Sequence, residues 1–378
     1  MRVIFSRFQG ALLGGFVARD LKDRGSNLKV STLRIQSSNE SILENLLRVI
    51  QFCVDSQSFQ ELDWNQLRFK EILPQGLEGD LRSFPRVIDR AIALTPLALL
   101  LQDNPALLDQ QIEKIARIWW PQTSAPNHLE SLQIVLKAIA LICQGTDRGY
   151  CRPSRFMPTV LDYLAADSIL GIQCGQVQAL IEQRAGLETA IETLSQPLLG
   201  CKDPAIESVY QDSLGIALAL FYFLDTPEDF SLTVLRSLRA GTLAPASCIL
   251  SSIFSGAYNG LENIPVGWRS RSRQFSRVKL GLQGSQPFSK SIKPLSAQSK
   301  PLAKLSSKPI ESGVFLGSES GSEAEVLHLG SQLFALWSGI YQGSLPYTQT
   351  NSAATVTSSR LTRSAGSLSS ILPQAHLK

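Results

Sequence analysis

Three adjacent polar residues, Asn39, Glu40 and Ser41, precede an amphipathic helical pattern and are the first candidates for chemistry. Their oxygens could bind a hard cation or orient a polar ligand, and the Glu40 carboxylate could act as a general base. They also suit a structural role, in which Ser38 caps the helix and Glu40 favours its first turn. The sequence leaves both interpretations open, with Glu40 as the candidate catalytic residue.

Asp20 and Tyr258 are further candidates for ligand binding. Tyr258 and Trp268 could line a nucleotide cleft, although aromatic residues at helical spacing also suit a core. Arg19 and the charged segment Asp80–Arg90 could recognise phosphate or form a solvated surface.

Three successive helices between Tyr210 and Trp268 are predicted to organise the chain. The first is apolar nearly all round and should be central. In the second, Thr226 is the expected N-cap, and four apolar residues should share one face: Phe230, Val234, Leu235 and Leu238. The third, from Pro245 to Leu261, is rich in Ser and Gly, so Gly256 should lie against a neighbouring backbone.

Helical periodicity also dominates the rest of the body, and no β alternation appears. The sequence therefore predicts an all-α fold, a single multi-helix orthogonal bundle with its loops at the ends. One further helix should begin at Ser38 or Ser41, and another should begin at Asn127. A third should span Val87–Leu101, with a kink or break at Pro96, and a fourth should run from Asn104-Pro105 to Trp120. The last three should cover Pro158–Ile172, Gly175–Arg184 and Glu188–Ser195.

Two glycine-containing segments give the chain a family resemblance. The run Gly256-Ala257-Tyr258-Asn259-Gly260, followed by Ile264-Pro265 and Trp268, resembles the C-terminal part of the ADP-ribosylglycohydrolases. The run Gly10-Ala11-Leu12-Leu13-Gly14 resembles the first motif of that family. The resemblance covers about Arg7 to Trp268 and implies an all-α hydrolase scaffold that holds magnesium and acts on ADP-ribose linkages.

The metal-binding motifs of the resembled family are eroded here. Its metal turn, G-D-x-D-T, corresponds to Thr242-Leu243-Ala244-Pro245-Ala246, and Arg19 stands where the first motif has aspartate, with Asp20 one residue later. Its T-D-D-T motif matches Ser38-Asn39-Glu40-Ser41, which has one carboxylate instead of two. Its M-R-I-A-P-L motif reads Ile92-Ala93-Leu94-Thr95-Pro96-Leu97, without the arginine, and its T-H motif reads Thr123-Ser124, with His128 displaced.

Magnesium requires converging oxygen ligands, which Leu243 and Pro245 cannot supply from their side chains. We therefore expect no metal site and no cofactor. The first hypothesis is a catalytically inactive member of the family, a binding or scaffolding module for an ADP-ribose-like nucleotide or a protein partner. The alternative is an active hydrolase of ADP-ribose or related glycosidic linkages, using Glu40 and Asp20 with other ligands.

Charge divides the chain near Trp268. Up to this residue there are 23 Lys and Arg against 28 Asp and Glu, whereas from Arg269 onward there are 13 against 4. Residues 1–268 are predicted to form the domain and 269–322 a basic, disordered linker. A third hypothesis is an accessory protein that uses this basic segment on nucleic acid or an acidic partner, although its few aromatic residues give little support for binding nucleic acid.

An apolar helical pattern returns at residues 323–343 and predicts an added helix that docks on the domain, followed by a disordered tail at 344–378. The six cysteines show no zinc-like spacing and suggest buried thiols in a reducing compartment. No stretch reaches the roughly 20 apolar residues of a membrane span, and the N-terminal apolar run lacks a cleavage site. We expect a cytoplasmic protein.

Overall fold

A computed structural model describes nine stretches of the chain, and all of them lie in the first of its two units, Met1–Tyr341. Within these stretches every regular element is a helix, which confirms the predicted all-α class. Of the predicted linker 269–322, Arg269 is described and residues 270–322 lie outside the described residues, as does the predicted tail 344–378. The stretches are 2–26, 36–56, 62–67, 86–120, 125–145, 153–196, 204–239, 245–269 and 323–339.

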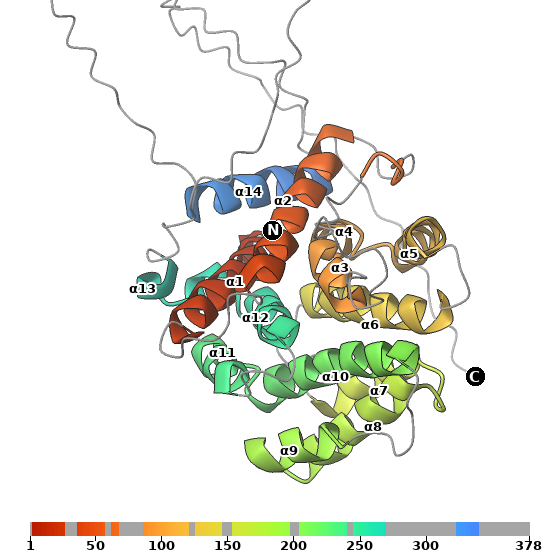
Figure 1. Ribbon diagram of the computed structural model, residues 1–378. Helices are drawn as coiled ribbons and strands as arrows, with labels where there is room; N and C mark the ends of the chain where they lie inside the picture. The colour runs from red at the N-terminus through yellow and green to blue at the C-terminus, as the bar shows by residue number, and fades with distance from the viewer. Residues whose placement is uncertain are drawn as a thin grey trace, which may run out of the picture. The chain divides into compact units, whose positions relative to one another are not determined.

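The described residues form fourteen α-helices and one short 3₁₀ helix, shown in Figure 1. In chain order they are α1 (Arg2–Ser26), α2 (Gln36–Ser56), α3 (Val87–Ala93), α4 (Thr95–Leu100), α5 (Pro105–Trp119), α6 (Ala125–Gln144), α7 (Pro153–Leu161), α8 (Ile169–Glu182), α9 (Leu187–Leu194), α10 (Pro204–Asp225), α11 (Phe230–Arg239), α12 (Pro245–Asn259), η2 (Leu261–Asn263), α13 (Val266–Arg269) and α14 (Glu323–Trp337).

The first and twelfth helices pack antiparallel with almost no space between their backbones. A Cβ atom added to Gly256 would overlap the carbonyl oxygen of Gly10, and one added to Gly14 would overlap the carbonyl oxygen of Ser252. This confirms the prediction that Gly256 lies against a neighbouring backbone. Small residues permit the approach because any larger side chain would have to enter the space of the partner backbone.

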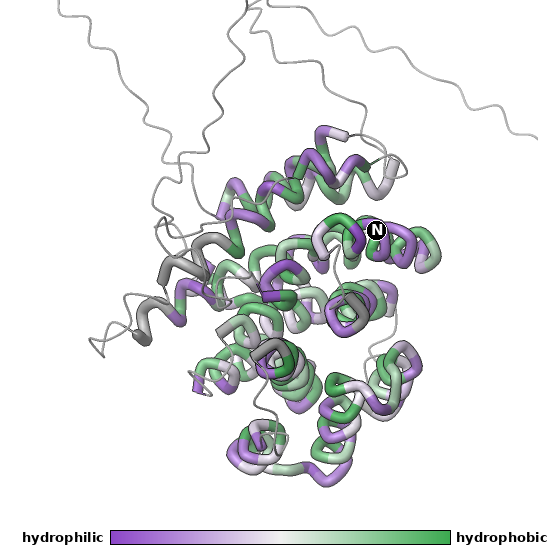
Figure 2. The backbone as a smooth tube through the Cα atoms, turned by 45° about the vertical axis from the view of Figure 1, so that its right-hand side comes forward, coloured by the Kyte–Doolittle hydropathy of each residue, from purple (hydrophilic) through white to green (hydrophobic). Residues whose placement is uncertain are grey.

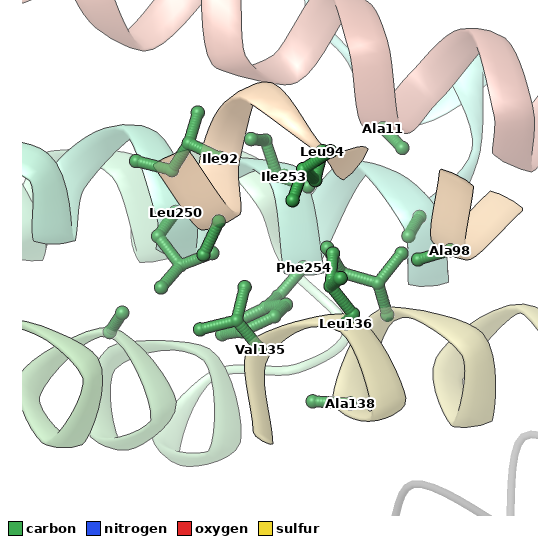
Figure 3. Packing of buried hydrophobic residues seen from close by; sticks show 14 of the residues in the cluster. Ala11, Ile92, Leu94, Ala98, Val135, Leu136, Ala138, Leu250, Ile253 and Phe254 are labelled. Atoms are coloured by element: carbon green, nitrogen blue, oxygen red, sulfur yellow. The ribbon is translucent and has the colours of Figure 1, made fainter. Parts of the chain in front are cut away.

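Helix α10 is central, as its sequence predicts. Its residues from Asp212 to Leu224 are all buried, and it contacts α6, α8, α9, α11 and α12. In the core beside it, Leu250 and Phe254 of α12 lie opposite Val135 of α6 and Ile92 of α3 (Figure 3). The outer helices alternate between hydrophobic and hydrophilic residues around their axes (Figure 2). This pattern is typical of helices that bury one face.

Helix α14, which follows residues 270–322 in the sequence, packs on α1, α2 and α4. Its Phe334 ring meets the rings of Phe5 and Phe8 edge-on, with centroids 5.0 and 5.6 Å apart. The Trp337 indole N–H donates to Asp103 over 2.9 Å. The helix ends at Trp337 rather than at Gly343, because Gly339 adopts a left-handed φ of 70° that stops the helix. Residues 340–343 lie outside the described residues.

The predicted boundaries at Pro96 and Asn104 are confirmed. The expected break near Pro96 separates α3 from α4, and the Asn104 side chain accepts the Leu107 N–H at 3.1 Å as α5 begins. Two other starts are wrong, because α2 begins at Gln36 and α6 at Ala125, which places Ser38 and Asn127 inside the first turn. The first apolar residue of a periodic pattern comes after the first turn, so the pattern locates a start only approximately.

The predicted helix Pro158–Ile172 is also wrong, because the chain forms two helices there. Helix α7 ends at Leu161, with Pro158 inside it, and α8 begins at Ile169. The Ser168 hydroxyl accepts the Gly171 N–H at 3.0 Å. This capping bond favours a fresh helix start over continuation of α7. Gly175 consequently lies inside α8 instead of beginning a helix.

The start of α11 differs from the prediction in the same way. Asp229 caps it by accepting the Leu232 N–H at 2.9 Å, whereas the Thr226 hydroxyl donates to the Tyr222 carbonyl. Asp and Thr are both good N-caps, so their sequence alone does not rank them. Leu235 does not share the buried face of Phe230, since it follows the buried Val234 by about 100° around the helix, and it is 49% exposed.

Candidate functional site

The residues predicted to carry chemistry do not converge in the described structure. Asp20 is half-buried on α1, ten residues or about 15 Å along the helix from Gly10. Tyr258 belongs to α12 close to Gly256, which packs against Gly10. Because the two helices are antiparallel, Asp20 and Tyr258 lie towards opposite ends of the pair.

Glu40, Asn39 and Ser41 belong to the first turns of α2, but their side chains lie outside the described residues, as do residues 242–244 of the matched metal turn. Tyr258 is only 9% exposed, and its ring stands edge-on to Phe223 with centroids 5.9 Å apart. These contacts favour the core role for Tyr258 over a place in an open cleft.

A polar cluster that the sequence did not reveal surrounds the beginning of α3. Asp212 of α10 is 3% exposed, and its Oδ2 accepts the Val87 N–H at 2.9 Å. Arg86, the N-cap residue of α3, makes no capping bond through its own side chain. Asp212 therefore caps α3 from a different helix, where the positive end of the helix dipole favours a carboxylate.

Asp89, in the first turn of α3, forms a pair with Asp212. Burial, with a smaller contribution from the negative charge of Asp212, raises the pKa of Asp89 to about 7 against the lowering effects of Arg86 and Lys22. Burial likewise raises the pKa of Asp212 to about 6, against the lowering effects of the Val87 N–H and Arg86. With a pKa near 7, the Asp89 carboxyl is protonated for part of the time at neutral pH.

Lys22 connects this pair to α1 and α12, because its charge acts on both Asp89 and Cys248. Cys248 is buried, and its thiol lies 3.2 Å from the Ser237 hydroxyl. Burial raises the pKa of Cys248, so the thiol stays protonated and unreactive at neutral pH. Lys22 of α1 therefore acts electrostatically on residues of both α3 and α12.

Arg90 stacks beside the carboxylate pair instead of standing free for phosphate. Its guanidinium lies 4.6 Å from the ring centroid of Trp120 and 5.5 Å from that of Trp119. The Trp120 ring is 5.3 Å from the His128 ring. Burial and the Arg90 charge lower the pKa of His128, so this histidine is neutral at pH 7. Since residues 87–90 are helical, the interpretation of Asp80–Arg90 as one charged loop is wrong for that part, and residues 80–85 lie outside the described residues.

The Asp89 carboxyl is a candidate for proton transfer. A carboxyl group whose pKa is near 7 can donate and accept a proton at physiological pH. Among the described residues there is no group of three His, Cys, Asp or Glu side chains placed to hold a metal ion. The cluster is a proton-transfer candidate composed of two acids from α3 and α10 and a lysine from α1.

Sequence reasoning missed this pair because its members are 123 residues apart. One signal was present: Asp212 is an isolated acid at the start of the long apolar run of α10. A charge in such a run needs a buried partner, since an uncompensated one would be costly. The sequence could not show that the partner is the backbone of α3.

Comparisons with known proteins identify no relative. No protein-family model matches the chain, and neither a curated protein nor a solved structure matches it. In the described part of the chain, no helix is both long enough and apolar enough to cross a membrane.

Proposed function

We propose that this chain is a catalytically inactive, ADP-ribosylglycohydrolase-like module that binds an ADP-ribose-like nucleotide. The observation that carries the proposal is the contact between Gly10 and Gly256. These glycines belong to the two segments, at opposite ends of the resembled region, whose sequences resemble the family's motifs. Their backbone-to-backbone packing supports a common scaffold in which both motifs have a structural purpose.

The donor set at the matched metal positions supports the inactive part of the proposal. Pro245 and Ala246 begin α12, and Ala246 is 2% exposed. A buried methyl group and a proline ring offer no oxygen to magnesium, and Leu243 offers none from its side chain. These residues do not fit the ion that the resemblance implies, so no reaction step is assigned to it.

A thermal-shift titration of the full chain with ADP-ribose, with and without magnesium, tests the binding proposal. A ligand that binds only the folded state raises the melting temperature by mass action. We expect a concentration-dependent rise with ADP-ribose that millimolar magnesium does not alter, and no rise with free ribose. Equal curves with and without ADP-ribose would refute nucleotide binding.

The Asp89–Asp212 pair supports a second candidate, an active hydrolase of ADP-ribose or related glycosidic linkages with an altered site. Glycosidic bonds can be cleaved when one carboxyl group protonates the leaving oxygen and a second carboxylate assists on the other side. Asp89, with its pKa raised to about 7, suits the acid, whereas Asp212 is 3% exposed and accepts the Val87 N–H, so it would have to be uncovered to act as the second group. This candidate requires no metal ligand from the eroded turn.

Product release from an ADP-ribosylated peptide, followed by chromatography, separates the two candidates. The inactive module gives the background rate in the wild type and in Asp89→Asn alike. The altered hydrolase gives turnover in the wild type that falls in Asp89→Asn, with unchanged ADP-ribose binding.

A further inference from the structure

Helix α14 has a more one-sided environment than α12, although both helices contain 15 residues. It packs mainly on α1 and α2 at the edge of the bundle (Figure 1) and on α4, whereas α12 is surrounded by α1, α3, α6, α10, α11 and η2. Ala324 and His328 of α14 are exposed. Residues 270–322 separate α14 from α13 along the chain. A helix packed on one side and joined through so long a segment can open without the rest of the bundle.

The surface of α1, α2 and α4 beneath α14, which we call the α14 groove, is aromatic on its α1 side. Phe5, Phe8 and Leu12 share one face of α1, because they are three and four residues apart. The Phe334 ring packs on the Phe5 and Phe8 rings, and the Trp337 ring lies 5.7 Å from that of Phe8. Release of α14 would therefore uncover Phe8, which is now fully buried.

The α14 groove also fixes the position of the bound helix along its axis. A Cβ atom added to Gly330 would lie 3.3 Å from a methyl carbon of Leu12 and 3.5 Å from the Cγ of Gln9. The Gln9 amide donates to the Leu327 carbonyl over 3.4 Å and to the Ser331 hydroxyl over 3.3 Å. The groove thus holds a helix with a small residue at its centre and a polar contact beside it.

We propose that α14 is a releasable cover, and that the α14 groove is a binding site for an amphipathic helix of the same pattern. That pattern is a small residue followed four and seven positions later by aromatic residues, as in Gly330, Phe334 and Trp337. Grooves that bind helices recognise side chains at such spacings, which lie on one face. In the resting chain α14 occupies the groove and lowers its apparent affinity for another helix. This inference does not depend on the proposed function.

Hydrogen exchange of the full chain tests the release of α14. We expect the amide protons on the buried side of α14 to exchange at least about tenfold faster than those of α12, because α14 opens separately. Leu333→Asp places a carboxylate at a fully buried position of α14. It should speed exchange in α14 further and leave exchange in α12 unchanged, because an unpaired buried charge is costly. Equal exchange rates in α14 and α12 of the wild type would overturn the proposal.

A fluorescent peptide with the sequence of residues 323–339 tests the α14 groove as a binding site. Its anisotropy should show at least about tenfold tighter binding to full-length Leu333→Asp, whose own α14 is displaced, than to the wild type. Circular dichroism melting establishes that this variant is folded. A peptide with both Phe334→Ala and Trp337→Ala should lose binding, whereas His328→Ala, which changes an exposed residue, should not. Absent binding, equal binding to the two proteins, or equal binding of the two altered peptides would each overturn the proposal.

Discussion

The contact between α1 and α12 and the Asp89–Asp212 pair are both buried, but they depend on opposite properties. The helix contact depends on the absence of side chains, because Gly10 and Gly256 leave the two backbones touching. The carboxylate pair depends on side chains whose charged form is disfavoured by burial, whereas the positive charges of Arg86 and Lys22 favour the charged form of Asp89. The comparison indicates that close helix packing fixes the scaffold. Substitutions at Asp89 or Asp212 should therefore cost less stability than a substitution at Gly256.

The largest expected effect lies in the helix contact. Gly256→Ala should cost about 3 kcal/mol of unfolding free energy, because the new methyl group overlaps the Gly10 carbonyl. The matched control is Gly175→Ala in α8, where an added Cβ meets no atom within 4 Å. That change should stabilise by up to about 1 kcal/mol through helix propensity. Urea unfolding measures both, and a neutral Gly256→Ala would remove the close contact from the account.

This contrast also shows what the sequence can predict. The approach at Gly256 follows from the Ser- and Gly-rich sequence of its helix, and the central place of α10 follows from its apolar run, so both signals are local. Asp212 capping α3 is a pairing between distant segments, which no local pattern encodes. The predicted start of α11 was wrong for another reason. Thr226 and Asp229 are both suitable N-caps, and tertiary contacts select Asp229.

The second effect concerns pH. The folded-state pKa values of Asp89 and Asp212 are raised to about 7 and about 6, so the folded state binds more protons than the unfolded one above pH 4. Their stabilising contribution is complete below about pH 4 and is lost as pH rises from about 4 through the folded pKa values of about 6 and about 7. Unfolding free energy should therefore fall by about 2 kcal/mol between about pH 5.5 and 7.

Comparison with Asp89→Asn isolates this effect from other titrating groups. His128, whose pKa is lowered, contributes in the opposite direction and is the same in both proteins. The variant carries a neutral side chain at every pH, so its stability should depend less on pH than that of the wild type. Parallel pH profiles for the two proteins would show that Asp89 titrates normally.

The smallest effect concerns the cap that Asp212 supplies. Asp212→Ala should cost about 1 kcal/mol, because the Val87 N–H loses its acceptor. Asp212→Asn keeps an acceptor oxygen and removes a buried charge, so it should cost less than the alanine variant. Chemical denaturation of both at pH 7.5 gives the order, and equal costs would mean that the charge of Asp212, not its hydrogen bond, stabilises α3.

The central claim, a scaffold that binds an ADP-ribose-like nucleotide without cleaving its linkages, is tested most directly by nuclear magnetic resonance. An ADP-ribosylated peptide is incubated with the full chain and magnesium, and binding and cleavage are followed in the same sample. The account predicts broadened ligand signals, which report binding, and no free ADP-ribose above the protein-free control. Magnesium-dependent release of ADP-ribose, or ligand signals unaffected by the protein, would contradict it.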